Sequence, residues 1–178
     1  LNIPFSERGR EQAKRLGMRL GNVDIKAIYT SDLGRARETA DEIARGCGAP
    51  VILVPEFREI DVGLWEGKNF EEARELDPEG VNRWLLDTAN TPIPGGESYA
   101  QVQKRAVSEL IELVKRHPDE TICVVSHAGP LKTIICHVLG MDLRNRSRID
   151  LANASISVIT YEDGQAKVLS LNDTCHLI

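Results

Sequence analysis

The chain has 178 residues, of which 42% are hydrophobic and 28% charged, with a net charge of -5 and a pI near 5.4. This length favours a single domain over residues 1–178, and the acidic balance argues against a nucleic-acid or anionic-membrane surface. The sequence shows neither an apolar run of the roughly 20 residues that a membrane span needs nor a signal peptide. We therefore expect a cytoplasmic protein that binds neither nucleic acid nor membrane.

The first third of the chain predicts alternating helices and strands. Ser6 is a suitable N-cap for the first helix, and Ser31 with Asp32 is expected to cap the second. Glycines mark the expected helix ends. The predicted elements are a helix over residues 7–20, a strand over 25–30, a helix that ends at Gly46, and a fully apolar strand over 51–54.

The middle of the chain contains a long mixed loop over residues 55–67, and a loop of this length inside a compact domain is usually functional. Short helices are expected around residues 70–76 and 81–86, the second with Trp84 as an anchor. A cluster of prolines and glycines follows at 91–96. Residues 68–97 are therefore expected to form a cap over the site.

The last part begins with a long amphipathic helix that opens at Glu97 and Ser98 and ends near His117. A β-branched apolar strand over residues 121–125 then runs directly into a tight turn at His127 and a further helix. Two strands, over 155–161 and 166–171, are joined by a turn at 163–164. The fold class expected is three-layer α/β/α with a mostly parallel sheet and an antiparallel C-terminal edge.

Chemically useful side chains follow three of the predicted strands: Arg35 after the first, Glu59 after the second and His127 after the third. If the strands are parallel, their carboxyl ends share one edge of the sheet. A cation such as Arg35 in the first turn of a helix is disfavoured by the macrodipole unless an anion joins it. Each residue alone has an ordinary structural explanation, but together they indicate an anion site.

Other candidates have simpler explanations. His117 and His137 are expected to be structural, and the arginines of residues 144–148 are expected to form a solvated rim. The four cysteines lack metal-ligand spacing, so we expect reduced thiols and no metal site, including at Cys175 and His176.

Four motifs in order resemble the signatures of the histidine phosphatase (phosphoglycerate mutase-like) superfamily. They are residues 29–40 (YTSDLGRARETA), 58–67 (REIDVGLWEG), 94–98 (PGGES) and 125–130 (VSHAGP), and the ending 172–177 (NDTCHL) is similar to that of bacterial phosphatase members. The resemblance covers essentially the whole chain. It implies phosphoryl transfer through a phosphohistidine, without a metal or another cofactor, on a small phosphorylated substrate.

The resemblance also implies roles for individual residues. Arg35 would bind the phosphoryl group, Glu59 would donate a proton to the leaving oxygen, and His127 would be the second histidine of the pocket. Arg58 and the backbone N–H of Ala128 would line the pocket.

One departure concerns the nucleophile, because the family's N-terminal Arg-His-Gly motif is absent from this sequence. We expect about 20–25 further residues before Leu1, including a strand beside the one that ends at His127, since unpaired backbone groups inside a sheet are costly. Residues 1–178 alone are then expected to be inactive. The alternative is a shortened protein in which that place is filled in another way.

Several functions remain open from the sequence. The motifs are closest to α-ribazole phosphatases of cobalamin biosynthesis and their broad-specificity relatives. A phosphoglycerate mutase is the first alternative, and a non-catalytic phospho-ligand binding module is the second. The sequence also leaves open whether the chain forms a homodimer.

Overall fold

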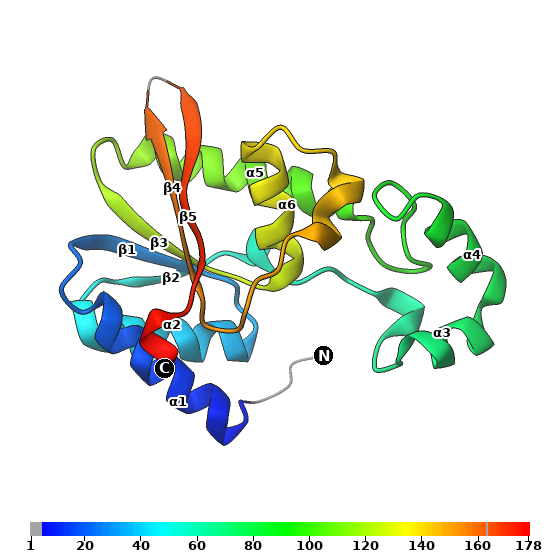
Figure 1. The fold of residues 1–178 in the computed structure, drawn as a ribbon, viewed down its shortest axis with the longest axis horizontal. Helices are drawn as coiled ribbons and strands as arrows, with labels where there is room; N and C mark the ends of the chain where they lie inside the picture. Colours follow the sequence, from blue (N-terminus) through cyan, green and yellow to red (C-terminus); the bar gives the residue numbers. More distant parts are fainter. Residues whose placement is uncertain (1–4, 163) are drawn as a thin grey trace.

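The computed structural model describes residues 5–162 and 164–178 and shows a parallel sheet between two layers of helices (Figure 1). The strands are β1 (Ile25–Thr30), β2 (Val51–Leu53), β3 (Thr121–Val125), β4 (Ile156–Glu162) and β5 (Gln165–Asp173). The α-helices are α1 (Glu7–Leu20), α2 (Gly34–Cys47), α3 (Phe70–Leu76), α4 (Pro78–Leu86), α5 (Tyr99–Arg116) and α6 (Ala128–Val138). Short 3₁₀ turns lie at Pro55–Phe57, Gly63–Trp65, Leu143–Arg148 and Cys175–Leu177.

The three strands β1, β2 and β3 form a sheet in the order β2-β1-β3, with both pairings parallel. Thr30, the last residue of β1, is in register with Leu53 of β2 and with Val125 of β3. All three strands therefore end at the same edge, as their apolar runs predict. The segments after Thr30, Leu53 and Val125 are brought together there.

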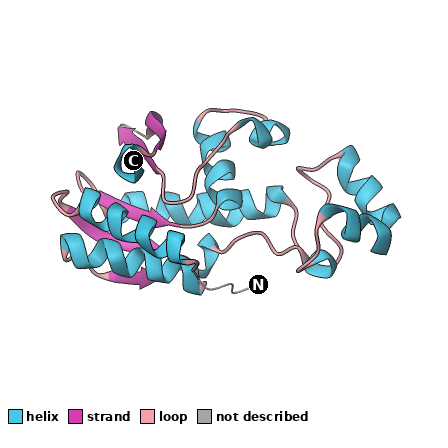
Figure 2. Cartoon of the chain, turned by 60° about the horizontal axis from the view of Figure 1, so that its bottom comes forward, coloured by secondary structure: helices cyan, strands magenta, loops and turns pink. Residues whose placement is uncertain are grey.

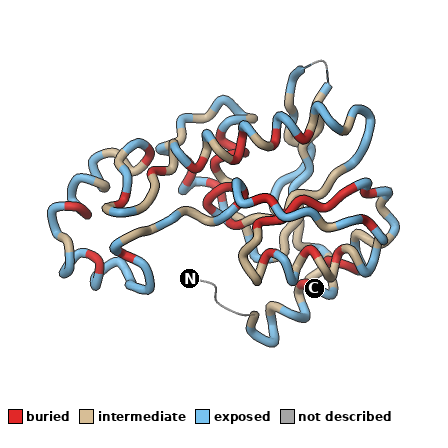
Figure 3. The backbone as a smooth tube through the Cα atoms, turned by 180° about the vertical axis from the view of Figure 1, so that it is seen from behind, coloured by how far each residue is buried: buried red, intermediate tan, exposed pale blue. Residues whose placement is uncertain are grey.

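Helices cover both faces of this sheet, which confirms the three-layer α/β/α prediction (Figure 2). On one face, α1 and α2 pack through aliphatic residues such as Leu16 and Ile43 onto Ile28 of β1. On the other face, Leu110 of α5 and Ile134 of α6 belong to a second apolar cluster. Burial is concentrated in β1 and in the inner faces of these helices (Figure 3).

Local capping explains two of the helix starts. The Ser6 hydroxyl accepts a hydrogen bond from the Gly9 N–H at 3.1 Å, and α1 and β1 have the predicted bounds. At the start of α5, Ser98 and Gln101 form a reciprocal capping box.

The prediction for the ends of α2 was wrong. Its N-cap is Leu33, without a side-chain cap, and it ends at Cys47, with Gly48 as the C-cap at φ +75°. Gly46 lies inside the helix because α1 and α2 cross there: a Cβ on Gly46 would lie 2.4 Å from the Gly17 carbonyl oxygen. The glycine serves close packing of two helices and not chain reversal.

The C-terminal hairpin also departs from the prediction. Strands β4 and β5 pair antiparallel, but they form a separate two-stranded sheet and do not extend the edge of the parallel sheet. Side chains attach the hairpin to the body instead: Ile156 packs with the α1 and α2 side, and Ile159 and Tyr161 pack with the α5 side. The expected turn at 163–164 includes Asp163, which lies outside the described residues.

Residues 68–97, called the helical lobe below, project from the body and carry α3 and α4 (Figure 1). Helix α4 begins at Pro78, earlier than predicted, because the Asp77 side chain accepts a hydrogen bond from the Gly80 N–H. Trp84 packs edge-to-face against Trp65, with ring centroids 5.9 Å apart. The lobe thus shares a small apolar cluster with the preceding loop.

The two chain segments at the base of the lobe are joined through their backbones. The Leu64 N–H donates to the Pro94 carbonyl at 2.9 Å, and the Glu97 N–H donates to the Asp61 carbonyl at 2.8 Å. The approach is close enough that a Cβ on Gly63 would lie 2.3 Å from the Pro94 carbonyl oxygen. The glycines of this region therefore allow the base of the lobe to close.

Within residues 5–162 and 164–178, every helix falls short of the combined length and apolar character that a bilayer crossing demands.

Candidate active site

The site is centred on contacts between the ends of β1 and β3. Ser31 follows β1 and is fully buried, and its backbone N–H donates to the Val125 carbonyl at 3.0 Å. The Ser31 hydroxyl lies 2.9 Å from Nε2 of His127 and also accepts a weaker hydrogen bond from the Leu33 N–H at 3.3 Å. Ser31 therefore orients the histidine, in place of the helix-capping role that its sequence position predicts.

Glu59 comes from the loop after β2 and reaches the first turn of α6. One carboxylate oxygen accepts a hydrogen bond from the Gly129 N–H at 3.3 Å, and the other accepts one from the Ile60 N–H at 2.9 Å. A Cβ on Gly129 would lie 2.1 Å from the Glu59 carboxylate, so only glycine leaves room for this approach. Ala128 is exposed and begins α6 beside this contact.

His127 is buried, as the N-cap residue of α6. Burial, followed by the positive charges of Arg35 and Arg105, lowers the pKa of His127 to about 4, against a small opposing effect from Asp32. The imidazole is therefore neutral at physiological pH while the site is empty of anions. An entering phosphate would favour its protonated form.

The two predicted arginines occupy different positions. Arg35 is half-buried in the first turn of α2, and its charge acts on His127. Arg58 is more exposed and forms a two-pronged ion pair with Asp32, with Nε at 2.6 Å from one carboxylate oxygen. This hydrogen bonding from Arg58 lowers the pKa of Asp32. Arg58 thus lies at the rim, bound to a carboxylate.

Sequence reasoning missed two arginines. Arg105 on α5 contacts the loop that carries Glu59 and acts electrostatically on His127. Arg146, expected in a solvated rim, is instead buried, with its guanidinium carbon 3.6 Å from the centroid of the Tyr99 ring. Its Nη1 donates to the Thr88 hydroxyl at 3.0 Å, which connects the body to the helical lobe. The sequence around these arginines does not predict their contacts, because both lie in charged segments.

The remaining histidines lie outside this constellation. His117 is 2.8 Å from the Tyr29 hydroxyl and 2.7 Å from a Glu120 carboxylate oxygen, and His176 is 2.9 Å from the Ala154 carbonyl oxygen. These contacts are consistent with structural roles.

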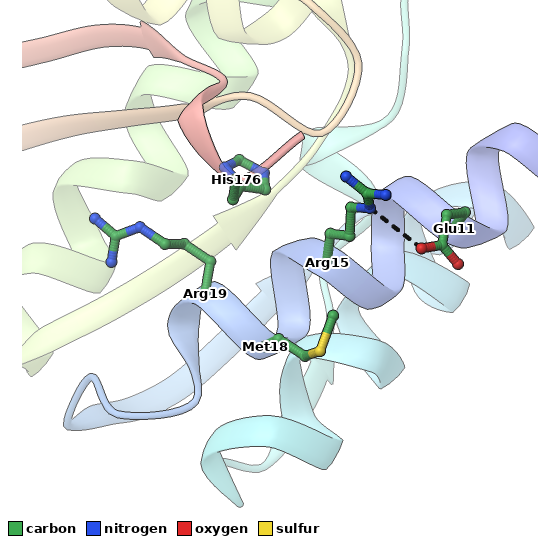
Figure 4. Close-up of a pocket in the computed structure, with 5 residues that line it drawn as sticks. All are labelled: Glu11, Arg15, Met18, Arg19 and His176. Atoms are coloured by element: carbon green, nitrogen blue, oxygen red, sulfur yellow. Dashed lines mark hydrogen bonds and ion pairs between the residues drawn. The ribbon is translucent and has the colours of Figure 1, made fainter. Parts of the chain in front are cut away.

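A shallow hollow elsewhere on the surface offers no comparable chemistry. It lies on α1 beside the C-terminal turn, and Figure 4 shows its lining residues Glu11, Arg15, Met18, Arg19 and His176. Arg15 is already paired with Glu11 at 3.1 Å. The ends of the strands are therefore the better candidate.

Taken together, the strand ends bring together groups that suit the binding of an anion. Arg35 and the N-terminal turns of α2 and α6 favour an anion, and neutral His127 can gain a proton as the anion arrives. Glu59 supplies a carboxyl group next to this positive region.

Comparison with known proteins agrees with this chemistry. The family model described as "Histidine phosphatase superfamily (branch 1)" matches residues 1–174. Phosphoserine phosphatase 1 of Hydrogenobacter thermophilus is 41% identical over 177 residues, which cover 99% of this chain and 84% of that protein. A probable phosphoglycerate mutase of Cronobacter sakazakii is 36% identical over 160 residues, with coverage of 89% and 74%.

Solved structures show the same fold. YhfR of Bacillus stearothermophilus superposes with a TM-score of 0.90 at 34% identity, covering 98% of this chain and 87% of that one. The α-ribazole phosphatase of Shigella flexneri superposes with a TM-score of 0.87 at 26% identity, covering 96% and 84%. The chain therefore belongs to the histidine phosphatase superfamily (branch 1).

Proposed function

We propose that this phosphatase hydrolyses small phosphomonoesters, without a metal ion, through a phosphohistidine intermediate. The observation that carries the proposal is the contact between the Glu59 carboxylate and the first turn of α6, directly beside buried His127. In this proposal Glu59 is the proton donor, and the first turn of α6 belongs to the anion-binding region. Phosphoryl transfer requires both groups, one for the leaving oxygen and one for the equatorial oxygens.

Each residue then has a defined task. Arg35 and protonated His127 neutralise the equatorial oxygens, assisted by the backbone N–H of Ala128 at the start of α6. Glu59 protonates the departing alkoxide and afterwards takes a proton from the water that attacks the phosphohistidine. Arg58 lies at the rim and binds the phosphoryl group after its ion pair with Asp32 breaks.

The nucleophilic histidine is proposed to lie upstream of Leu1. Strand β3 pairs with β1 along one edge, and no other strand of the described residues pairs with its second edge. An additional parallel strand on that second edge would end beside His127, where an attacking imidazole is needed. Such a strand would also satisfy the backbone groups of that edge.

Among substrates, we propose a phosphoserine-like alkyl phosphate first, because the relative with 41% identity is named a phosphoserine phosphatase. The α-ribazole 5′-phosphate predicted from the motifs is supported by a structure at 26% identity, together with a place in cobalamin biosynthesis. Phosphoglycerate mutase activity is the alternative that the Cronobacter relative supports. A panel of these three substrate types, assayed with a metal chelator present, separates the possibilities.

The test of the mechanism is Glu59→Gln in the full-length natural protein. Loss of a general acid should reduce turnover of an alkyl phosphate such as phosphoserine by about 10²- to 10⁴-fold, and should affect an activated aryl phosphate much less. Glu56→Gln, on the same loop but exposed, is the matched control. Equal losses on both substrates would exclude Glu59 as the proton donor.

The mass of the natural protein tests the origin of the nucleophile. An additional N-terminal segment containing histidine, labelled by phosphate during turnover, supports the proposal. A natural protein without such a segment that binds phosphate tightly but shows no turnover would identify a phospho-ligand binding module instead.

A further inference from the structure

Arg105 on α5 makes an unusually complete set of contacts with segments distant in sequence. Its guanidinium pairs with both carboxylate oxygens of Glu97, with Nε to Oε1 at 2.8 Å and Nη2 to Oε2 at 2.9 Å. The remaining donors reach two backbone carbonyls of the loop after β2: Nη1 donates to Glu56, and Nη2 donates to Glu59 at 3.2 Å. A planar fork with several fixed donors suits this arrangement, and an ammonium does not.

Glu97 extends the same connection to the other side of Glu59. Its Oε2 accepts a hydrogen bond from the Asp61 N–H at 3.0 Å, and its own N–H donates to the Asp61 carbonyl. The Arg105–Glu97 ion pair thus binds backbone groups of residues 56, 59 and 61. Regular backbone pairing of the kind found in helices and strands is lacking between residues 58 and 62, so the pair replaces it.

The ion pair is well suited to hold a fixed geometry. The side chains of Arg105 and Glu97 are 21% and 25% exposed, which distinguishes them from the surface ion pairs of the same helix. Burial alone would raise the pKa of the Glu97 carboxyl, but hydrogen bonds from Arg105 and the Asp61 N–H outweigh it, so the pKa is lowered. Glu97 therefore stays ionised and the pair stays closed at neutral pH.

The Glu59 carboxylate has little other support. It accepts hydrogen bonds from the Ile60 N–H, which is next to it in the chain, and from the Gly129 N–H at 3.3 Å. The direction of the side chain therefore follows from the position of its backbone, and the Glu59 carbonyl is the group that Arg105 binds.

We infer that Arg105 and Glu97 are positioning residues for catalysis, which hold the Glu59 backbone so that its carboxyl group faces the leaving oxygen. The inference rests on the proposed function of Glu59 as proton donor. Neither residue needs to touch the substrate. The pair acts on the protonation of the leaving group. Because the charge of Arg105 also acts on His127, the variant Arg105→Lys, which keeps that charge, separates positioning from electrostatics.

The experiment measures kcat and KM of the full-length natural protein for phosphoserine and for p-nitrophenyl phosphate. Arg105→Met and Glu97→Gln should each lower kcat for phosphoserine by about 10- to 100-fold, a part of the full general-acid effect. They should change kcat for p-nitrophenyl phosphate less than about 3-fold, because its leaving group needs no proton. Lys115→Met, which breaks an exposed ion pair with Glu112 on the same helix, should change neither.

A double-mutant cycle distinguishes positioning from general damage. On a Glu59→Gln background, Arg105→Met should cost little further activity toward phosphoserine, because the group that it positions is already gone. Arg105→Lys, which keeps the charge without the fork, should recover only part of the loss and gives a folded variant if Arg105→Met is unstable.

Three results would contradict the inference: equal losses on both substrates, additive losses with Glu59→Gln, or full activity of Arg105→Met and Glu97→Gln. A wild-type protein that hydrolyses neither substrate would instead overturn the proposed function itself.

Discussion

The Nε2 atom of His127 lies 2.9 Å from the Ser31 hydroxyl oxygen, although the two residues are 96 positions apart in the chain. The contact joins the ends of two adjacent parallel strands, and it holds a buried imidazole beside two arginine charges. The Ser31 hydroxyl can donate a hydrogen bond to the neutral ring or accept one from the protonated ring. The pair therefore fits a histidine that changes its protonation state when an anion binds.

This environment predicts an acid-sensitive fold. The pKa of His127 is about 4 in the folded protein, whereas the ordinary pKa of an exposed histidine is 6.5, so the unfolded chain takes up the proton first. The contribution of His127 to the free energy of unfolding is constant above pH 6.5 and decreases as the pH falls from 6.5 to 4, by an amount on the order of 3 kcal/mol. Urea unfolding between pH 7.5 and pH 4 measures the change.

His127→Gln should remove this part of the pH dependence. The lowered pKa values of Asp32 and Glu97 act in the same direction and remain in the variant, so a weaker loss of stability in acid persists. His137→Gln, at an exposed position of α6, serves as the control and should behave like wild type. An unchanged slope in His127→Gln would show that the histidine titrates normally.

Asp32→Asn should strengthen the binding of inorganic phosphate. In the wild-type protein the Asp32 carboxylate forms an ion pair with the Arg58 guanidinium, and it also repels an incoming anion. Because such partly exposed charge pairs are worth about 0.2–1 kcal/mol, the inhibition constant should fall by about 1.4- to 5-fold at low salt and by less at high salt. Asp24→Asn, at the other end of β1, should have no effect. Weaker phosphate binding would mean that Asp32 serves to orient Arg58.

Gly129→Ala should displace the Glu59 carboxylate, since the new methyl group would lie 2.1 Å from its oxygen. The end of a glutamate side chain moves easily, and alanine suits a helix, so stability should change by less than about 1 kcal/mol. Turnover of alkyl phosphates should nevertheless fall by about 10- to 100-fold. Steady-state kinetics and thermal unfolding of the same preparation test both halves of the prediction. A variant with full activity would show that Glu59 acts from another position.

Arg146→Met should loosen the helical lobe. The substitution removes the contact with the Tyr99 ring and the hydrogen bond to Thr88, at a cost of about 1–3 kcal/mol. Limited proteolysis should then cleave within residues 68–97 faster than in wild type. Arg144→Met, two residues away, breaks an exposed ion pair with Asp142 and removes a weak electrostatic attraction to Asp87 of the lobe, and should change the cleavage rate much less. The same cleavage rate in both variants would exclude Arg146 as the anchor.

The parts of the fold that the sequence predicts well are those fixed by local chemistry. Ser6 and the apolar spacing after it define α1, and the β-branched run of β3 defines a strand covered on both faces. The shared direction of β1 and β3 then brings Ser31 and His127 to one edge.

Predictions fail where tertiary contacts reassign a residue. Serine is a preferred residue at helix N-caps, which is why Ser31 is predicted to be one. Its hydroxyl instead lies against His127, which is distant in sequence. Glycine often ends a helix, but Gly46 lies inside α2, where it allows α1 to pack closely. Arg105 and Arg146 look like solvated charges because nothing in the neighbouring sequence reveals that backbone carbonyls, an aromatic ring or a carboxylate will surround them.

The closed base of the helical lobe has a consequence for how substrate preference can change. Its two connecting segments are held by backbone hydrogen bonds, from Leu64 to Pro94 and from Glu97 to Asp61, which do not depend on the side chains between them. These hydrogen bonds at the base therefore offset the entropy cost of closing the loop. That cost grows only slowly with loop length, so longer or shorter inserts change it little. If residues 68–97 form the predicted cap over the site, grafting the corresponding segment of another phosphatase between Lys68 and Gly96 should alter which phosphomonoester is accepted, while Glu59 and its supports stay in place.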